Sequence, residues 1–129
     1  MTLRSVQWLE LIWVAMGLSY NAVSYQRFTD GSAPLAPTDP VSGAVFMVLS
    51  GVLIVAGMRG WKLTYKFGIL PLTILLIYSG LLLHLAAFAS DRGLPTYSSF
   101  AAWLFAVLIN VYGIVVMVLG GWLSWRAPQ

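Results

Sequence analysis

Four long apolar runs constrain this chain more than any other feature. Each is close to the roughly 20 residues that an α-helix needs to cross a hydrocarbon core of about 30 Å, and they cover residues 6–25, 41–58, 67–89 and 98–125. Backbone polar groups in lipid must be paired within the segment, so each run is predicted to be a helix. The runs do not alternate as barrel strands do. The expected fold is an all-α integral membrane protein, a single domain in which four transmembrane helices form an antiparallel bundle.

The composition of the chain agrees with a lipid environment. Of its 129 residues, 60% are hydrophobic and 9% are charged, whereas a soluble domain carries about 25% charged residues. The absence of cysteine excludes disulfides, thiolate metal sites and cysteine nucleophiles. A formal net charge of +3 is too small to indicate a nucleic-acid partner. The expected partners are therefore the lipid bilayer and either other transmembrane subunits or further copies of the chain.

The positive charges predict an orientation. With four spans, five basic residues share one side of the membrane: Arg4, Arg59, Lys62, Lys66 and Arg126. Lysine and arginine favour the cytoplasmic side. We therefore expect a multi-pass protein of the bacterial cytoplasmic (inner) membrane, with both termini and loop 59–66 in the cytoplasm and loops 26–40 and 90–97 outside. A cleaved signal peptide is the alternative for the first run, but Glu10 would interrupt its apolar core.

Aromatic and turn-forming residues agree with these boundaries. Tryptophan and tyrosine gather at membrane interfaces, and the predicted belts are Trp8, Trp61, Tyr65, Trp122 and Trp125 inside and Tyr25, Phe28, Tyr97 and Trp103 outside. Asp39, which precedes Pro40, is expected to cap the second helix, and Ser98 or Ser99 the fourth. Pro71 falls in the first turns of the third predicted helix, where a missing N–H costs little.

Small and polar residues recur at helical spacing along every predicted helix. Lipid tails are as apolar as leucine, so membrane helices associate through small residues and through hydrogen bonds between polar groups. Intervals of three or four keep such residues on one side of a helix. We expect the helices to meet along these faces, whose main members are Gly17, Gly43, Ser50, Gly80, Ala106 and Gly113.

Three polar side chains within the predicted spans are candidates for substrate or proton binding. Glu10 lies about 6 Å inside the cytoplasmic end of its helix, and an acid inside a span is a functional hypothesis by default. Its structural alternative is to reach the inner surface or to pair with Arg4 or another cation. Asn21 and Asn110 are expected either to bond across helices or to contact a substrate.

His84, the only histidine in the chain, lies near the outer end of the third run and is a further candidate. The favoured role is a hydrogen bond to the first helix, at Tyr20, Asn21 or Ser24. The second is a proton or substrate role, because its pKa is ordinarily near neutrality. The third is axial ligation of a haem or chlorophyll-type macrocycle, for which Gly80 one turn earlier would leave room. No other cofactor and no metal is expected, because clusters of histidine and carboxylate are missing.

Together these features favour a non-catalytic subunit, or an assembly or stabilising factor, of a larger membrane complex. No catalytic residue is assigned and an enzyme is not expected. The first alternative is a small homo-oligomeric transporter, proton-coupled in one version, that uses Glu10 and His84; the second is a pigment- or haem-binding subunit. In size and in its first-helix acid the chain is similar to the small multidrug resistance transporters. It shares no further motif with them, and its charge bias predicts one orientation, unlike their dual-topology members.

Overall fold

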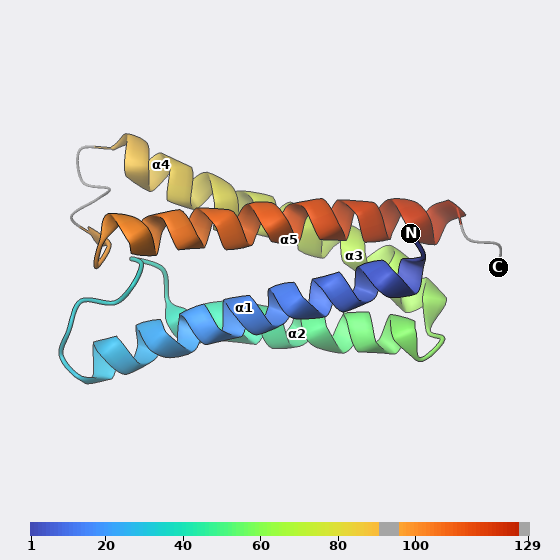
Figure 1. Ribbon diagram of the computed structural model, residues 1–129, viewed down its shortest axis with the longest axis horizontal. Helices are drawn as coiled ribbons and strands as arrows, with labels where there is room; N and C mark the ends of the chain where they lie inside the picture. Colours follow the sequence, from blue (N-terminus) through green and yellow to red (C-terminus); the bar gives the residue numbers. More distant parts are fainter. Residues whose placement is uncertain (91–95, 127–129) are drawn as a thin grey trace.

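The structure is a computed structural model that describes residues 1–90 and 96–126. All regular elements in these residues are helical, as predicted: α1 (Leu3–Thr29), α2 (Pro40–Met58), α3 (Lys62–Leu75), the π-helical segment η1 (Leu76–Leu82), α4 (Leu83–Ala89) and α5 (Phe100–Arg126). Because α3, η1 and α4 follow one another without a break, they form one continuous rod, here called the third rod (Figure 1).

Three stretches are long and apolar enough to cross a membrane: Pro40–Met58, Lys62–Ala89 and Phe100–Arg126. The helix α1 is as long as α5, at 27 residues, or about 40 Å at 1.5 Å per residue. It is less apolar because polar side chains interrupt its sequence. Gln7, Glu10 and Ser24 among them are buried inside the protein, so α1 directs these polar groups toward the other helices.

Several helix boundaries differ from those predicted. The first helix runs over Leu3–Thr29 and not 6–25, and the third rod begins at Lys62 and not at residue 67. The predicted loop over 59–66 therefore shortens to residues 59–61, where Gly60 adopts φ +102°, a backbone conformation that favours glycine. Pro71 consequently lies inside α3 and not in its first turns, and it removes one intrahelical hydrogen bond there.

The predicted helix caps are confirmed. The Asp39 carboxylate accepts a hydrogen bond from the Ser42 backbone N–H at 2.9 Å, directly before α2. Hydrogen bonds from the side chain and backbone of Ser42 hold the pKa of Asp39 below its ordinary value, so the capping carboxylate is ionised near neutral pH. Ser99 Oγ accepts from the Ala102 N–H at 3.1 Å in the first turn of α5. Of the predicted external loop 90–97, residues 91–95 lie outside the described residues.

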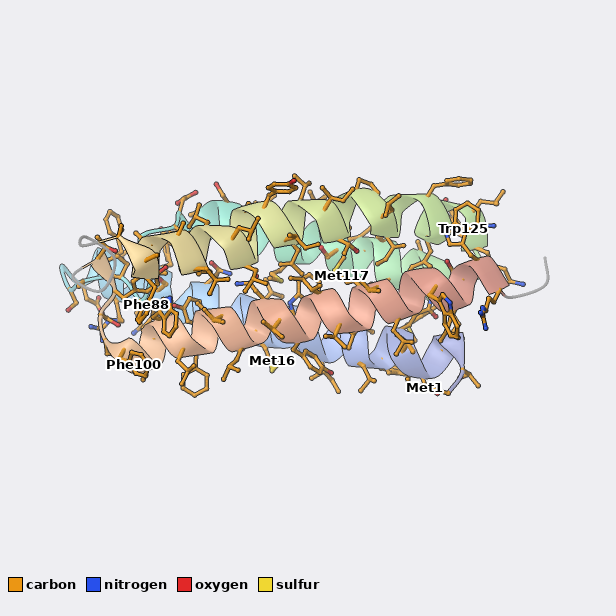
Figure 2. The ribbon with its side chains drawn as sticks, turned by 90° about the horizontal axis from the view of Figure 1, so that it is seen from above. Met1, Met16, Phe88, Phe100, Met117 and Trp125 are labelled. Carbon is orange, nitrogen blue, oxygen red and sulfur yellow. The ribbon has the colours of Figure 1, made fainter. Side chains whose placement is uncertain are left out.

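The rods lie side by side and neighbours run antiparallel (Figure 1). α1 packs against α2 and α5, and α3 packs against the same two helices, so α1 and α3 occupy opposite corners. The start of α1 and the end of α5 lie at one end, here called the terminal end, and the turn between α1 and α2 lies at the other, the distal end. Figure 2 shows Met1 and Trp125 at the terminal end and Phe88 and Phe100 at the distal end.

Glycines of α5 admit side chains of other helices into close contact. A Cβ atom at Gly113 would overlap the indole of Trp13, and one at Gly120 would overlap both the Glu10 carboxyl and the Tyr65 hydroxyl. The next residue, Gly121, is different, because a Cβ there would lie 3.5 Å from Ile69, an ordinary van der Waals distance. Two adjacent positions of one helix thus differ in whether they have room for a methyl group.

This difference gives a matched test of the packing. Gly120→Ala is expected to destabilise the protein by about 1–3 kcal/mol, because the new methyl group must displace the Glu10 or Tyr65 side chain. Gly121→Ala should be neutral or stabilising, since alanine favours a helix over glycine by up to about 1 kcal/mol. Thermal unfolding in detergent compares the two variants, and equal melting temperatures would contradict this arrangement.

Candidate functional site

The polar residues predicted to carry function fall into two groups. Asn21, His84 and Asn110 all line one cavity toward the distal end. Glu10 lies in a separate, closed cluster toward the terminal end, where it contacts Tyr65 of α3. The structure therefore brings three of the four candidate residues together and leaves Glu10 apart from them.

Glu10 is fully buried, with 0% of its surface exposed. Its Oε1 atom accepts a hydrogen bond of 2.6 Å from the Tyr65 hydroxyl, and its Oε2 atom has no partner among the described residues. The expectation that Glu10 reaches the surface or pairs with Arg4 is wrong. Arg4 donates instead to the Met58 carbonyl at 3.1 Å. Side chains six residues apart lie on different sides of a helix. Arg4 therefore faces α2, whereas Glu10 faces the interior of the protein.

Two further orphan polar atoms lie on the same face of α1 as Glu10. Gln7 Nε2 and Trp13 Nε1 are buried without a hydrogen-bond partner among the described residues. Each is spaced three residues from Glu10, which keeps all three side chains on one side of the helix. A buried polar atom without a partner is costly, and all three such side-chain atoms among the described residues belong to this face of α1.

The distal cavity has a volume of about 430 Å³. α2 packs against α3, whereas η1 and α4 pack mainly against α5, so α2 and the third rod diverge toward the distal end (Figure 1). The cavity fills the space between them. Its lining comes from all four rods and is mainly apolar, with polar contributions from Tyr20, Asn21, Ser79, His84 and Asn110 and, where α2 begins, from Thr38, Asp39 and Ser42.

The two asparagines bond within their own helices. Asn21 Nδ2 donates to the Gly17 carbonyl and Asn110 Nδ2 to the Ala106 carbonyl, both at 2.8 Å. The expected hydrogen bonds across helices are not made by either amide in the described residues, because the carbonyl four residues earlier lies within reach of a short side chain. Each amide oxygen instead packs against a glycine of a neighbouring helix, Gly43 for Asn21 and Gly80 for Asn110.

His84 has its partner outside α1. Its Nδ1 atom lies 2.6 Å from the hydroxyl of Tyr97, in the segment before α5, and its backbone carbonyl accepts a 3.0 Å hydrogen bond from Trp103 Nε1. The predicted bond to the first helix is therefore wrong. Tyr20 of α1 donates instead to the Ala102 carbonyl at 2.9 Å, which ties α1 to α5 and leaves the imidazole to Tyr97.

Tyr65 and Tyr97 are the two functional-site residues that sequence reasoning missed. Both were assigned to interfacial belts, yet only 1% and 5% of their surfaces are exposed. Their hydroxyls pair with the two buried ionisable groups, Glu10 and His84. The sequence held one indication of these pairs, the predicted depth in the membrane. Tyr65 and Glu10 were both predicted near the cytoplasmic side, and Tyr97 and His84 near the outer side.

The room that was predicted beside Gly80 for a macrocycle on His84 is not present. The space beside Gly80 that was expected to admit a flat ring holds the Asn110 amide. Within residues 1–90 and 96–126, no three His, Cys, Asp or Glu side chains are grouped so as to hold a metal ion. The described groups are instead suited to hydrogen bonding.

Comparison with protein families, with characterised proteins and with solved structures finds no match for this chain.

The Glu10–Tyr65 pair can be tested as a structural contact. Tyr65→Phe is expected to destabilise the protein by about 1–3 kcal/mol, because it leaves a second oxygen of a buried carboxyl unpaired. Glu10→Gln should cost less, because the amide oxygen still accepts from Tyr65. Adding Glu10→Leu to Tyr65→Phe should recover part of the loss. Melting temperatures in detergent report these variants and Glu10→Leu alone, and additive losses in the double variant would contradict direct coupling.

Proposed function

We propose that the chain is a four-span protein of the bacterial cytoplasmic membrane and that it acts as a non-catalytic subunit, or assembly factor, of a larger membrane complex. Both termini are cytoplasmic in this proposal. The observation that carries the subunit role is an apolar groove on the outside of the α1–α2 pair, which suits a transmembrane helix of a partner protein.

Length and charge support four spans in this orientation. The 27 residues of α1 exceed the roughly 20 needed to cross the hydrocarbon core. Basic side chains pack on tryptophans at the terminal end, with Lys66 Nζ 3.8 Å from the Trp125 ring centre and the Arg126 guanidinium 4.0 Å from that of Trp122. Cationic and tryptophan side chains together are typical of the cytoplasmic membrane interface.

The groove has the shape and chemistry of a helix-docking surface. It has a volume of about 530 Å³, and its walls are almost entirely carbon. Its lining residues are Leu18, Asn21, Ala22, Tyr25, Pro40, Val41, Ala44, Val45, Val48 and Leu49. Ala22 and Ala44 are small residues from facing helices, and small residues let the backbone of another membrane helix approach closely. An entering helix would contact α1 and α2 along their distal halves.

The described connections between helices are short, and this favours recognition within the bilayer. They comprise residues 30–39 between α1 and α2, 59–61 between α2 and α3, and 90 and 96–99 between α4 and α5. None of them contributes a residue to the buried apolar cluster of the protein. Nearly all of the exposed large hydrophobic side chains belong to the helices and not to these connections. A partner protein would therefore contact mainly the membrane-embedded surface of the helices.

The orientation predicts the location of inserted reporters. A reporter fused after Gln129 and one inserted at Gly60 are expected to be cytoplasmic, and one inserted at Ala33 external, because the positive residues retain their side of the membrane. Paired phosphatase and fluorescent-protein fusions measure this. An external reading at Gly60 would contradict the proposed topology.

The groove predicts which variants lose the partner. Ala22→Leu combined with Ala44→Leu fills the groove and is expected to abolish co-purification of a membrane protein from the native membrane in mild detergent, while the chain itself is recovered normally. Ala86→Leu, at an exposed position of α4, is the matched control and should retain the partner. Mass spectrometry identifies the proteins recovered. A bare homodimer from the parent chain would contradict the subunit role and favour a transporter.

A further inference from the structure

We propose that the distal cavity binds a neutral, membrane-soluble carbonyl compound, an ester lipid or a quinone, through a hydrogen bond donated by His84 Nε2. This goes beyond the subunit role and does not depend on the groove partner. It rests on the tautomer of His84, on the lining of the cavity and on its opening at the protein surface.

The contact with Tyr97 determines which imidazole nitrogen carries the proton. Tyr97 makes one side-chain hydrogen bond in the described residues, the 2.6 Å contact with His84 Nδ1. If Nδ1 were the donor, the hydroxyl proton of a residue only 5% exposed would have no acceptor within residues 1–90 and 96–126. Buried polar groups are nearly always paired, so Tyr97 donates and Nδ1 accepts. The neutral imidazole then carries its proton on Nε2.

The Nε2 donor has no hydrogen-bond partner among the described residues, and His84 is one of the residues that line the cavity. No hydrogen bond to Nε2 is present among the described residues, and the atom is not one of the fully buried orphans. His84 lines the cavity together with Asn21 and Asn110. Each of these amides donates one N–H to its own helix, which leaves a second N–H on each. The cavity thus offers donors and favours a ligand that accepts hydrogen bonds.

The charges of the lining favour a neutral ligand. Among the described residues that line the cavity, Asp39 is the single charged one, and its carboxylate already accepts from Ser42 at the start of α2. This described lining has no lysine or arginine to neutralise a phosphate or carboxylate. Transfer of an unpaired charge into such surroundings is costly, whereas a carbonyl oxygen needs only a hydrogen-bond donor.

The shape of the cavity suits a molecule with an apolar body. Its volume of about 430 Å³ lies within the roughly 300–1,000 Å³ of small-molecule sites. Leu75 and Leu83 line it and are also 51% and 42% exposed, so it reaches the protein surface between α2 and the third rod. The π-helical segment η1 runs along it, and π-helical turns are frequent at functional sites.

Binding to the full-length protein in detergent tests the proposal with two pairs of probes. 2-Decyl-1,4-benzoquinone is compared with decylbenzene, and a short-chain diacylglycerol with its diether analogue, so that the oxygen atoms by which each pair differs are carbonyl oxygens. At least one carbonyl probe should bind more tightly than its partner. His84→Phe should weaken that probe about five- to tenfold, the loss of one hydrogen bond, and leave its partner unchanged. If His84→Phe does not fold, Tyr97→Phe replaces it in the test. This variant removes the hydrogen bond to Nδ1 and should reduce the preference for the carbonyl probe over its carbonyl-free partner.

Leu83→Trp and Leu85→Trp form the matched control for location. The two leucines are 42% and 41% exposed on α4, but only Leu83 lines the cavity. Leu83→Trp should abolish binding and Leu85→Trp should not. If only the quinone probe shows carbonyl-dependent binding, the ligand is a quinone. If only the diacylglycerol does, the ligand is an ester lipid. Equal binding to both tryptophan variants, or an equal effect of His84→Phe on carbonyl and carbonyl-free probes, would overturn the proposal.

Discussion

Polar side chains seated on glycines determine how these helices meet. In a bilayer the apolar faces gain nothing by leaving lipid, so contacts depend on close approach and on polar groups that need protein surroundings. Polar side chains have a glycine of another helix beneath them at several points, among them the pairs Glu10–Gly120, Trp13–Gly113, Asn21–Gly43 and Asn110–Gly80. A glycine exposes its backbone, where Cα–H groups can contact an oxygen. The distances between helices are therefore determined at these positions.

The helices pack closely at the terminal end of the protein and separate around a cavity at the distal end. At the terminal end α3 stays against both α2 and α5, and the Glu10–Tyr65 bond closes the interior. Beyond Pro71 the third rod passes through η1 and leaves α2, so Asn21, Asn110 and His84 face a cavity. The core residues Trp13 and Met117 lie between the two regions along the helices. Glu10 and His84 thus belong to separate environments, which weakens a transport mechanism that uses them jointly.

The helices and their caps could be predicted from the composition and spacing of the residues. The buried hydrogen bonds could not, because they join residues that are distant in the sequence. The apolar runs are sufficient to predict an all-helical protein, and local rules predict caps at Asp39 and at Ser98 or Ser99. Tyr65 was misplaced because an interfacial tyrosine and one that donates to a buried group have the same sequence neighbourhood. The early start of the third rod was missed because Lys62 and Lys66 suggested a loop, although Lys66 stays helical by packing on Trp125. Hydrogen bonds between distant residues leave no periodic signal.

Asn21 connects the groove and the cavity, because it lines both. Its amide oxygen packs against Gly43 of α2. The contact between α1 and α2 at Asn21 therefore forms part of the lining of both the groove and the cavity. A helix that docks in the groove and shifts α1 against α2 must move this lining. By linkage, any change in ligand affinity that a docked partner causes is matched by an equal change in partner affinity when the ligand binds. A subunit built in this way would associate differently with its complex according to the contents of the membrane around it.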